Sequence, residues 1–274
     1  MVAGDTLRSY HNFLTTHVIS YLPVCAEAVY SYRNGVTIAT AVRQHVSSKY
    51  FYQTDLNNFF GSVDEDFLFT LLAKNSAHFP FIFDPAYVKQ IVRLLTHQNR
   101  LAVGYSTSPK VSNACLYEFD LKVLSYCKER RLIYSRYSDD IIISGLESAP
   151  VKAAAAEIQV ILAVLYGSTF LVNSAKSKFT RVGRKIKLLG LVILPNKVVS
   201  IDMHFKRYVE KRIHYYLTDS LKFLKLMGAD EKKGISKMCG YLSYVNSVDP
   251  AYLKKLRRKY GDIIDMFLHR SFVK

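Results

Sequence analysis

The chain has 274 residues, half of them hydrophobic, and a formal net charge of +16. This length and apolar content allow one large core or two small ones, which excludes an intrinsically disordered protein. No apolar run approaches the length needed to cross a bilayer, and charged residues interrupt residues 1–13, where a signal peptide needs an apolar stretch. The sequence therefore predicts a cytoplasmic protein without a membrane partner.

The excess positive charge lies in the C-terminal part of the chain. Residues 1–170 contain 15 Lys and Arg against 14 Asp and Glu, whereas residues 171–274 contain 23 against 8. A solvated helix surface explains a mild excess, but one this large on about a hundred residues favours a polyanionic partner. The cysteines have no zinc or disulfide spacing, so we expect four buried thiols, at Cys25, Cys115, Cys127 and Cys239.

The predicted elements follow from hydrophobic periodicity and turn signals. In chain order they are a helical stretch at 5–32, a strand ending at Asp55, helices at about 63–77 and 84–98, a helix from Asn113 to Cys127, a hairpin of 132–137 and 140–145, and an amphipathic helix at 151–166. Two short strands at 185–193 and 197–202 come next, and residues 203–274 are predicted to form three helices with breaks near Gly228 and at 246–250.

Two acidic sites end predicted strands. Asp55 follows one apolar run, and Asp139 and Asp140 interrupt another without the Gly or Asn that a solvated hairpin tip usually has. A solvated turn is the alternative interpretation of the pair. Carboxylates that converge repel one another unless a divalent cation offsets them, and oxygen ligands suit Mg²⁺.

These segments resemble the catalytic motifs of reverse transcriptases. "TDLNNFFGSV" (54–63) resembles the first motif, "GYSTSPKVSN" (104–113) the third, and "YSRYSDDIIIS" (134–144) the YxDD motif, in the same order. The likeness continues through "LVNSAKSKF" (171–179) to "GYLSYVNSVDP" (240–250). It is greatest to bacterial retron-type reverse transcriptases and their relatives in antiphage defence.

The resemblance implies a fold and a domain organisation. The fold is an α+β right-hand polymerase palm, an antiparallel sheet with helices, with reduced fingers and a helical thumb. Residues 1–50 would form partial fingers, 51–202 the palm, in which 63–110 includes fingers-like helices, and 203–274 a basic thumb. The implied partners are a structured RNA template, an RNA/DNA duplex and dNTPs.

The resemblance also assigns site residues. It implies two Mg²⁺ ions, with Mn²⁺ as a substitute, held by the backbone carbonyl of Leu56 and the carboxylates of Asp55, Asp139 and Asp140. It implies that Lys176 protonates the pyrophosphate, Phe60 excludes the ribose 2′-hydroxyl, Tyr137 packs beneath the primer terminus, Gly104 lets the backbone approach the nucleotide, and Ser106 contacts the template. Ordinary core, strand, cap and surface positions are the alternatives for these five residues.

Four arginines are further candidates for contacts with nucleic acid or nucleotide, and three hydroxyl residues are candidates for a helix cap. Arg136 and Arg181 could contact phosphates, and Arg33 and Arg43 could contact the triphosphate. Ser106, Thr107 and Ser108 could cap the following helix.

Two departures from the family pattern leave alternatives open. Ala102 and Val103 stand where relatives usually have Pro-Gln, and only about fifty residues precede Asp55. The first favours untemplated or low-complexity synthesis, and the general alternative function is an untemplated or protein-primed nucleotidyltransferase. The second favours dependence on a partner protein, an RNA or self-assembly, and both departures together leave a non-catalytic RNA-binding scaffold as an alternative.

Overall fold

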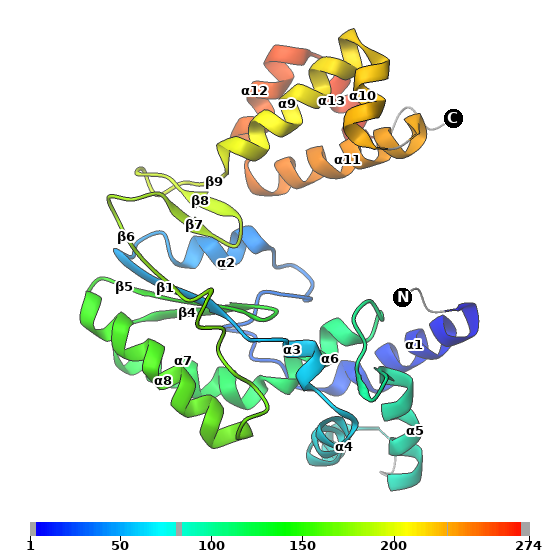
Figure 1. Ribbon diagram of the computed structural model, residues 1–274, viewed down its shortest axis with the longest axis vertical. Helices are drawn as coiled ribbons and strands as arrows, with labels where there is room; N and C mark the ends of the chain where they lie inside the picture. The colour runs from blue at the N-terminus through cyan, green and yellow to red at the C-terminus, as the bar shows by residue number, and fades with distance from the viewer. Residues whose placement is uncertain (1–3, 81–83, 229, 270–274) are drawn as a thin grey trace. The chain divides into compact units, whose positions relative to one another are not determined.

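The computed structural model describes residues 4–80, 84–228 and 230–269 (Figure 1). The chain forms two compact units, Met1–Arg184 and Lys185–Lys274. This division lies before the strands at 186–201, whereas the sequence placed it after residue 202. The reason is that these strands pack with the C-terminal helices, through contacts between β9 (Val199–Ile201) and α11 (Glu231–Val248).

The first unit contains both helices and strands, so the α+β class is confirmed. Its helices are α1 (Asp5–His17), η1 (Ile19–Tyr21), α2 (Ile38–Gln44), α3 (Phe59–Ser62), α4 (Glu65–Lys74), η2 (Ser76–His78), α5 (Pro85–Leu95), α6 (Ser108–Cys115), α7 (Tyr117–Glu129) and α8 (Ser148–Tyr166). Its strands are β1 (Tyr50–Asp55), β2 (Thr96–His97), β3 (Arg100–Leu101), β4 (Ile133–Tyr137), β5 (Asp140–Gly145) and β6 (Lys178–Arg181).

A four-stranded antiparallel sheet in the order β4-β5-β1-β6 organises this unit. Because side chains alternate along a strand, Tyr52, Ile141 and Ile143 face the core, on the side where α8 contacts β1 and β5. Phe51 and Asp55 point to the opposite face, on which α2 packs (Figure 1). The sheet thus separates a helix-covered core from the face that carries the carboxylate.

Helix α8 corrects the expectation that no apolar run could span a bilayer. Its 19 residues are long and apolar enough by length and composition. Its buried stripe, which includes Val151, Ile158 and Leu162, belongs to the core cluster of the first unit. Length and composition alone are weak evidence for a membrane span, and core helices pass the same criterion.

A buried histidine joins α2 to the sheet. His45 is fully buried, with Nδ1 2.6 Å from the Ser144 hydroxyl and Nε2 2.7 Å from the Ser135 hydroxyl. Burial lowers the pKa of His45 to about 3, because a charged imidazole loses its hydration there. The imidazole is therefore neutral in the folded protein at any pH near neutrality.

We expect His45 to make the protein less stable in mild acid. The folded-state pKa lies below the ordinary value of 6.5, so the unfolded chain binds the proton first, and stability falls as the pH drops below about 6.5. The loss between pH 8 and pH 5 should be about 2 kcal/mol of unfolding free energy. Urea titrations of wild type and His45→Gln at both pH values measure it; equal pH dependence in the two proteins would contradict the assignment.

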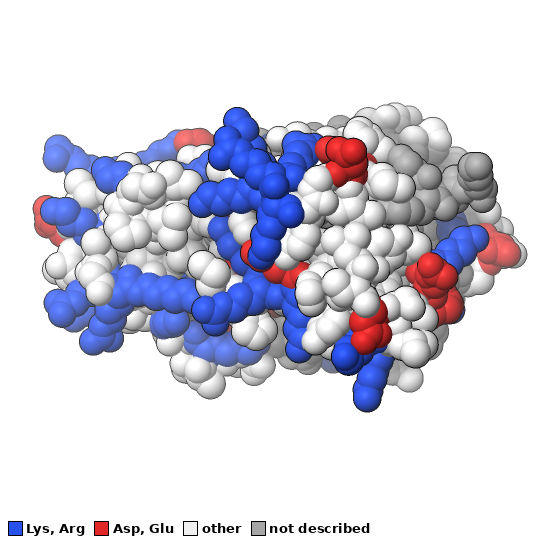
Figure 2. Space-filling model, turned by 90° about the horizontal axis from the view of Figure 1, so that it is seen from above, with Lys and Arg blue, Asp and Glu red and all other residues white. Residues whose placement is uncertain are grey.

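Within its described residues, the second unit combines a small sheet with five helices. The strands β7 (Ile186–Leu188), β8 (Leu191–Ile193) and β9 form an antiparallel sheet in chain order. The helices are α9 (Met203–Thr218), α10 (Ser220–Met227), α11, α12 (Pro250–Tyr260) and α13 (Ile263–His269). Residues 185–274 contain 19 Lys and Arg against 8 Asp and Glu. Figure 2 shows a face of the molecule on which basic side chains are prominent.

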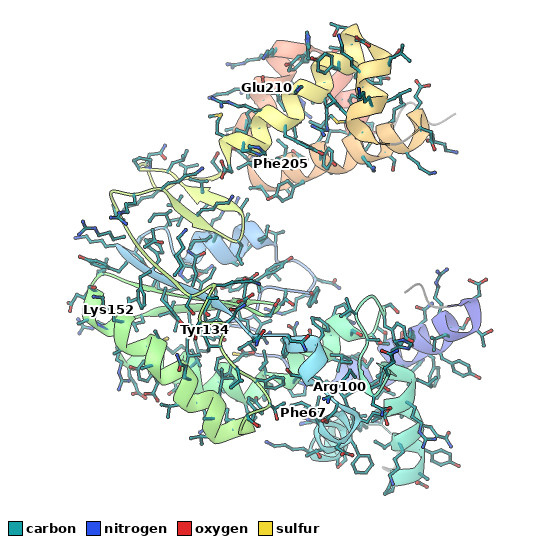
Figure 3. The ribbon with its side chains drawn as sticks, viewed as in Figure 1. Phe67, Arg100, Tyr134, Lys152, Phe205 and Glu210 are labelled. Carbon is teal, nitrogen blue, oxygen red and sulfur yellow. The ribbon has the colours of Figure 1, made fainter. Side chains whose placement is uncertain are left out.

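Polar contacts connect the helices of this unit. Glu210 of α9 accepts hydrogen bonds from Tyr252, at 2.9 Å, and from Lys259, at 2.6 Å, which ties α9 to α12 (Figure 3). Phe205 of α9 packs against Tyr241 and Tyr244 of α11. These aromatic residues are half-buried between the two helices, so they serve at least partly as core.

Several predicted elements differ from the observed ones. The helical stretch at 5–32 ends at His17 apart from the short η1, and the helix predicted to start at Asn113 starts at Ser108 and breaks at Leu116. The predicted strand at 185–193 is a hairpin that turns at Leu189 and Gly190, both with positive φ. Strand β6 was missed, and in the described part of the chain after residue 203 five helices replace the three predicted. All four cysteines are free and buried, as expected.

Candidate active site

The acidic pair lies at the tip of the β4–β5 hairpin. Tyr137 and Asp140 pair in register, so the loop consists of Ser138 and Asp139 alone. Ser138 has φ 59°, a left-handed conformation that favours glycine in such turns. The cost is offset locally: the Ser138 amide donates to Ser31 Oγ at 2.8 Å, and its carbonyl accepts from Arg136 at 2.7 Å. The tip is thereby fixed in one conformation.

Strand β1 brings Asp55 to the same place. Asp55 is the register partner of Asp140 in the β1–β5 ladder, so both side chains leave the sheet on one face. The Leu56 amide donates to the Asp139 carbonyl at 3.3 Å and extends the pairing to the hairpin tip. Asp55 and Asp140, 85 positions apart in the sequence, therefore meet at one end of the sheet, as the strand pattern predicted.

Lys176 supplies the nearest positive charge. Its ammonium donates to Asp55 Oδ2 at 2.5 Å, and this contact raises the pKa of Lys176. Asp55 is only 7% exposed, and its other oxygen, Oδ1, is buried without a hydrogen-bond partner among the described residues. Loss of hydration, followed by the charges of Asp139 and Asp55, raises the pKa of Asp140 to about 6.

The carboxylate oxygens of Asp55, Asp139 and Asp140 are chemically suitable ligands for a divalent cation, although they are not yet arranged around one common point. Within residues 4–80, 84–228 and 230–269, no three His, Cys, Asp or Glu side chains are arranged to hold a metal ion. The three carboxylates repel one another, and the Lys176 ammonium occupies one Asp55 oxygen that a metal ion would otherwise bind. A buried oxygen with a free lone pair, beside two further carboxylates, is nevertheless the hard oxygen chemistry that Mg²⁺ prefers.

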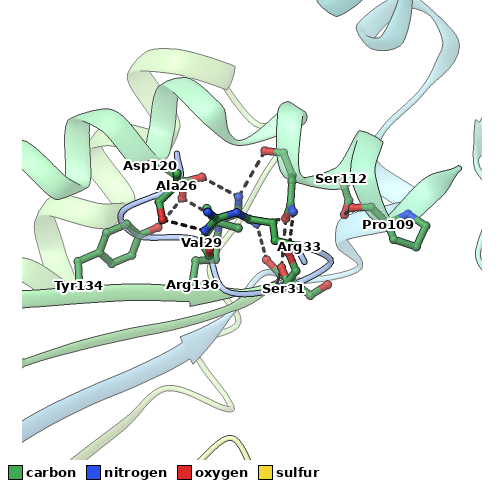
Figure 4. A network of polar contacts seen from close by, with 11 residues as sticks. Ala26, Val29, Ser31, Arg33, Pro109, Ser112, Asp120, Tyr134 and Arg136 are labelled. Carbon is green, nitrogen blue, oxygen red and sulfur yellow. Dashed lines mark hydrogen bonds and ion pairs between the residues drawn. The ribbon is translucent and has the colours of Figure 1, made fainter. Parts of the chain in front are cut away.

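A buried ionic network supports the hairpin from the core side (Figure 4). Arg136 is fully buried and donates through Nε and Nη2 to the two oxygens of Asp120, at 2.7 and 2.6 Å. Tyr134 donates to the same carboxylate at 2.6 Å. Asn113 donates to the Ser31 carbonyl at 2.9 Å, and its own carbonyl oxygens accept from Arg136. Arg136 therefore is not a phosphate contact, and that expectation was wrong.

Sequence reasoning missed most of this support. Ser31, Asn113 and Asp120 reach the hairpin from three separate segments, and only Arg136 had been singled out. Asp120 did carry a signal, because it falls on the buried stripe of α7 together with Phe119 and Val123. A charged residue on an apolar stripe indicates a buried partner.

The residues predicted to contact the nucleotide, primer or template lie in the same unit as the carboxylates. Within the described part of the chain, none of them forms a side-chain hydrogen bond with Asp55, Asp139 or Asp140. Phe60 is half-buried in α3 against the buried Phe59, with ring centroids 5.5 Å apart. Tyr137 is half-buried on the carboxylate face of β4. Gly104, with φ 95°, and Ser106 are exposed in the loop before α6.

The structure changes the roles predicted for the cap residues and for Arg33, and it leaves Arg43 and Arg181 as candidates. Thr107 is the residue before α6 but makes no side-chain cap, and the Ser108 hydroxyl donates to the Ala102 carbonyl at 2.6 Å instead. Arg33 donates to the Ala26 and Val29 carbonyls, which leaves it committed to the backbone of its own segment. Arg43 and Arg181 remain exposed.

Comparison with known proteins places this geometry in a family. The profile described as "Reverse transcriptase (RNA-dependent DNA polymerase)" matches residues 6–193. The chain is similar to the retron Ec83 reverse transcriptase of Escherichia coli, with 27% identity over 245 residues, covering 86% of this chain and 74% of that protein. The retron Ec86 reverse transcriptase of Escherichia coli is 24% identical over 224 residues, covering 79% of this chain and 63% of that protein.

A solved structure agrees on the fold. Telomerase from Candida tropicalis in complex with a TWJ fragment of telomeric RNA superposes with a TM-score of 0.51 at 11% identity, over 93% of this chain and 46% of that one. Sheet, hairpin and carboxylates together define a polymerase of the palm type. The chain belongs to the reverse transcriptase family, and the retron-type resemblance seen in the sequence is confirmed. It spans less than half of the telomerase chain and about two thirds to three quarters of the two retron enzymes.

Proposed function

We propose that the protein is an RNA-directed DNA polymerase that works on a dedicated structured RNA in antiphage defence. The observation that carries the proposal is the meeting of Asp55 with the Asp139–Asp140 tip in a chain of this family. A scaffold that only binds RNA has no reason to concentrate carboxylates beside a polyanion. The defence role rests on likeness to the retron enzymes.

We propose that the carboxylates of Asp55, Asp139 and Asp140 and the carbonyl of Leu56 hold two Mg²⁺ ions, or Mn²⁺ in their place. Such ions, when bound, lower the pKa of a primer 3′-hydroxyl and neutralise the charge of the triphosphate and leaving pyrophosphate. The unpartnered Oδ1 of Asp55 supports this assignment. Lys176 would leave Asp55 for the triphosphate and act as the acid for the pyrophosphate; its exposed side chain supports that movement.

We propose that four further residues contact the nucleotide, the primer or the template. Phe60 would exclude a ribose 2′-hydroxyl, and Tyr137 would support the primer terminus from the carboxylate face of β4. Gly104 and Ser106 would meet the nucleotide and the template, which their exposure supports. In this proposal residues 1–50 are partial fingers, the sheet of the first unit is the palm, and the helices after residue 202 are the thumb.

Basic residues of the second unit would follow the phosphates of an RNA/DNA duplex. The excess of 19 Lys and Arg over 8 Asp and Glu in residues 185–274 supports this role and makes binding depend steeply on salt. The contacts that the reduced fingers cannot supply would come from the RNA, from a partner protein or from self-assembly.

Primer extension tests the function. Purified protein receives a labelled DNA primer, an RNA template, dNTPs and Mg²⁺, and the products are sequenced. We expect products complementary to the template and none without RNA. Products that form equally well without RNA would support the second candidate, untemplated nucleotidyl transfer, which the 74% exposed Val103 at a usual glutamine position favours.

Replacing Phe60 with alanine is expected to weaken the choice of dNTP over rNTP. Removing the ring opens space at the proposed 2′-hydroxyl position, so rNTP incorporation should rise about tenfold or more relative to dNTP, an effect of roughly 1.4 kcal/mol. Single-turnover incorporation of dGTP and GTP measures the ratio. Phe69→Ala on α4 is the control and should leave the ratio unchanged; an unchanged ratio in Phe60→Ala would make Phe60 a core residue only.

A further inference from the structure

The first unit has a basic, aromatic-lined groove on the face of the sheet opposite the carboxylates. One hollow of about 350 Å³ lies between the start of α8 and the edge strand β6. It is lined by Tyr50, Ser148, Val151, Lys152, Phe179, Thr180, Arg181 and Arg184. Figure 3 shows Lys152 near the end of α8 that follows β5. A second hollow of about 430 Å³ shares Tyr50, Arg181 and Arg184 and adds Lys49.

Register places this groove away from the polymerase site. Arg181 pairs with Tyr50 and Phe179 with Tyr52 in the β1–β6 ladder, so these side chains share the face of Tyr52, opposite Asp55. Tyr50 and Asp55 stand at the two ends of β1, roughly 17 Å apart at 3.3 Å per residue. The groove is therefore a separate site, with no part in the chemistry at the carboxylates.

The cations of the groove have no acidic partners. Lys49, Lys152, Arg181 and Arg184 form no ion pair within the described part of the chain. Four like charges around two joined hollows repel one another and raise the local concentration of anions. A single small anion would not need two hollows, so the arrangement favours a ligand with repeated negative charges.

The aromatic rings identify the kind of polyanion. Phe179 is 49% exposed on the edge strand, with its ring 4.8 Å from that of Tyr52, and Tyr50 lines both hollows. Rings next to cations are how single-stranded nucleic acids are bound, because the bases stack while the phosphates meet Lys and Arg. Base faces inside a duplex are not available for this contact. The hydroxyl of Ser148, at the start of α8, is a suitable partner for a ribose 2′-hydroxyl.

We propose that this groove binds a single-stranded segment of RNA, with phosphates at Lys152, Arg181 and Arg184 and bases against Tyr50 and Phe179. The two hollows accommodate consecutive nucleotides. This role goes beyond polymerisation and does not require it, because the groove would retain an RNA while its other part is copied or released at the opposite face.

Fluorescence anisotropy with a labelled, unstructured 12-nucleotide RNA tests the proposal. We expect Lys152→Ala/Arg184→Ala to weaken binding about tenfold and to reduce the slope of log K against log salt by about 1.4, or 0.7 for each lost phosphate contact. The control Lys89→Ala/Lys122→Ala removes the same charge from exposed positions on α5 and α7. Equal losses in both double variants would overturn the proposal, because net charge alone would then explain the binding.

Stacking is tested separately. Phe179→Ala should weaken binding about fivefold, the lower range for one stacked base, and should bind an abasic 12-mer no worse than wild type does. The control Tyr87→Ala, on α5, should bind both probes like wild type. A DNA 12-mer of the same sequence should bind more weakly than the RNA. Equal binding of RNA and abasic probe by wild type, or of RNA and DNA, would contradict the assignment.

RNA binding in the groove and polymerase activity at the carboxylates can fail separately. Asp139→Asn should bind the 12-mer like wild type, and the groove variants should extend a preannealed primer within about twofold of the wild-type rate at saturating substrate. Photo-crosslinking of a 4-thiouridine RNA should label peptides that contain Tyr50 or Phe179. Labelling confined to the second unit would overturn the groove as the binding site.

Discussion

Replacing Asp120 with alanine is expected to lower the free energy of unfolding by about 3–5 kcal/mol. The change leaves the Arg136 guanidinium fully buried without its carboxylate partner and removes the acceptor of Tyr134. A buried charge without a partner is among the most destabilising changes known. Urea unfolding followed by circular dichroism measures the difference.

The same helix offers a matched control. Glu118 forms an ion pair with Lys74 at 3.1 Å, but both side chains are partly exposed to solvent, so Glu118→Ala should cost less than about 1 kcal/mol. An Asp120→Ala cost as small as that of Glu118→Ala would show that the Arg136 pair contributes little. The double variant Asp120→Ala/Arg136→Met should regain much of the stability, because neither buried charge remains.

That double variant also separates folding from positioning. Arg136 donates to the carbonyl of Ser138, the strained residue next to Asp139. Without this bond the hairpin tip should be less well fixed, so the double variant should fold yet incorporate nucleotides more slowly, with kcat reduced more than KM is changed. Wild-type kcat in a folded double variant would mean that the other contacts of Ser138 hold the turn alone.

Asp139→Asn is expected to reduce nucleotide incorporation by a factor of about 10³ or more. The amide has nearly the same shape but lacks the charge proposed to hold the cations. The backbone bond from Leu56 to the carbonyl of residue 139 remains, so the fold should not change. Single-turnover primer extension measures the rate, and the thermal midpoint checks folding.

Asp66 provides the control for this second substitution. It is exposed on α4, and Asp66→Asn removes the same charge from the same unit. We expect Asp66→Asn to retain the wild-type rate within about twofold. Incorporation by Asp139→Asn at the rate of Asp66→Asn would remove Asp139 from the catalytic group.

The carboxylate arrangement could be predicted because each acidic residue ends a strongly apolar strand. The runs before Asp55 and after Asp140 specify buried strands, and strand pairing brings the ends together. Strand β6 has no such pattern: "KFTR" (178–181) is an exposed edge strand, and only its pairing with β1 defines it. Edge strands with basic residues carry weak hydrophobic signals.

The number of helices in the second unit was underestimated for a related reason. Its helices are separated by very short connections, which hydrophobic periodicity does not resolve. Their starts do carry a signal, because Asp202, Asp219, Asp230 and Asp249 each accept a backbone hydrogen bond as N-caps. Attention to caps would have located four of the five helices.

The network around the hairpin could not be predicted from local sequence. Arg136 resembled a surface arginine because nothing in its local sequence distinguishes it from a surface charge. Its burial depends on Asp120, Asn113 and Ser31, which come from other elements. Long-range polar pairing leaves no periodic pattern, apart from a charge on a buried helix stripe such as Asp120.

The most direct test of a shared metal site is Mn²⁺ binding, measured by electron paramagnetic resonance. Asp55→Asn and Asp139→Asn should each weaken Mn²⁺ binding on the order of tenfold or more, and the double variant should lose little beyond the larger single effect, because both residues hold the same ions. Unchanged Mn²⁺ affinity in Asp55→Asn, or losses that simply add, would show that the two strand ends do not share an ion.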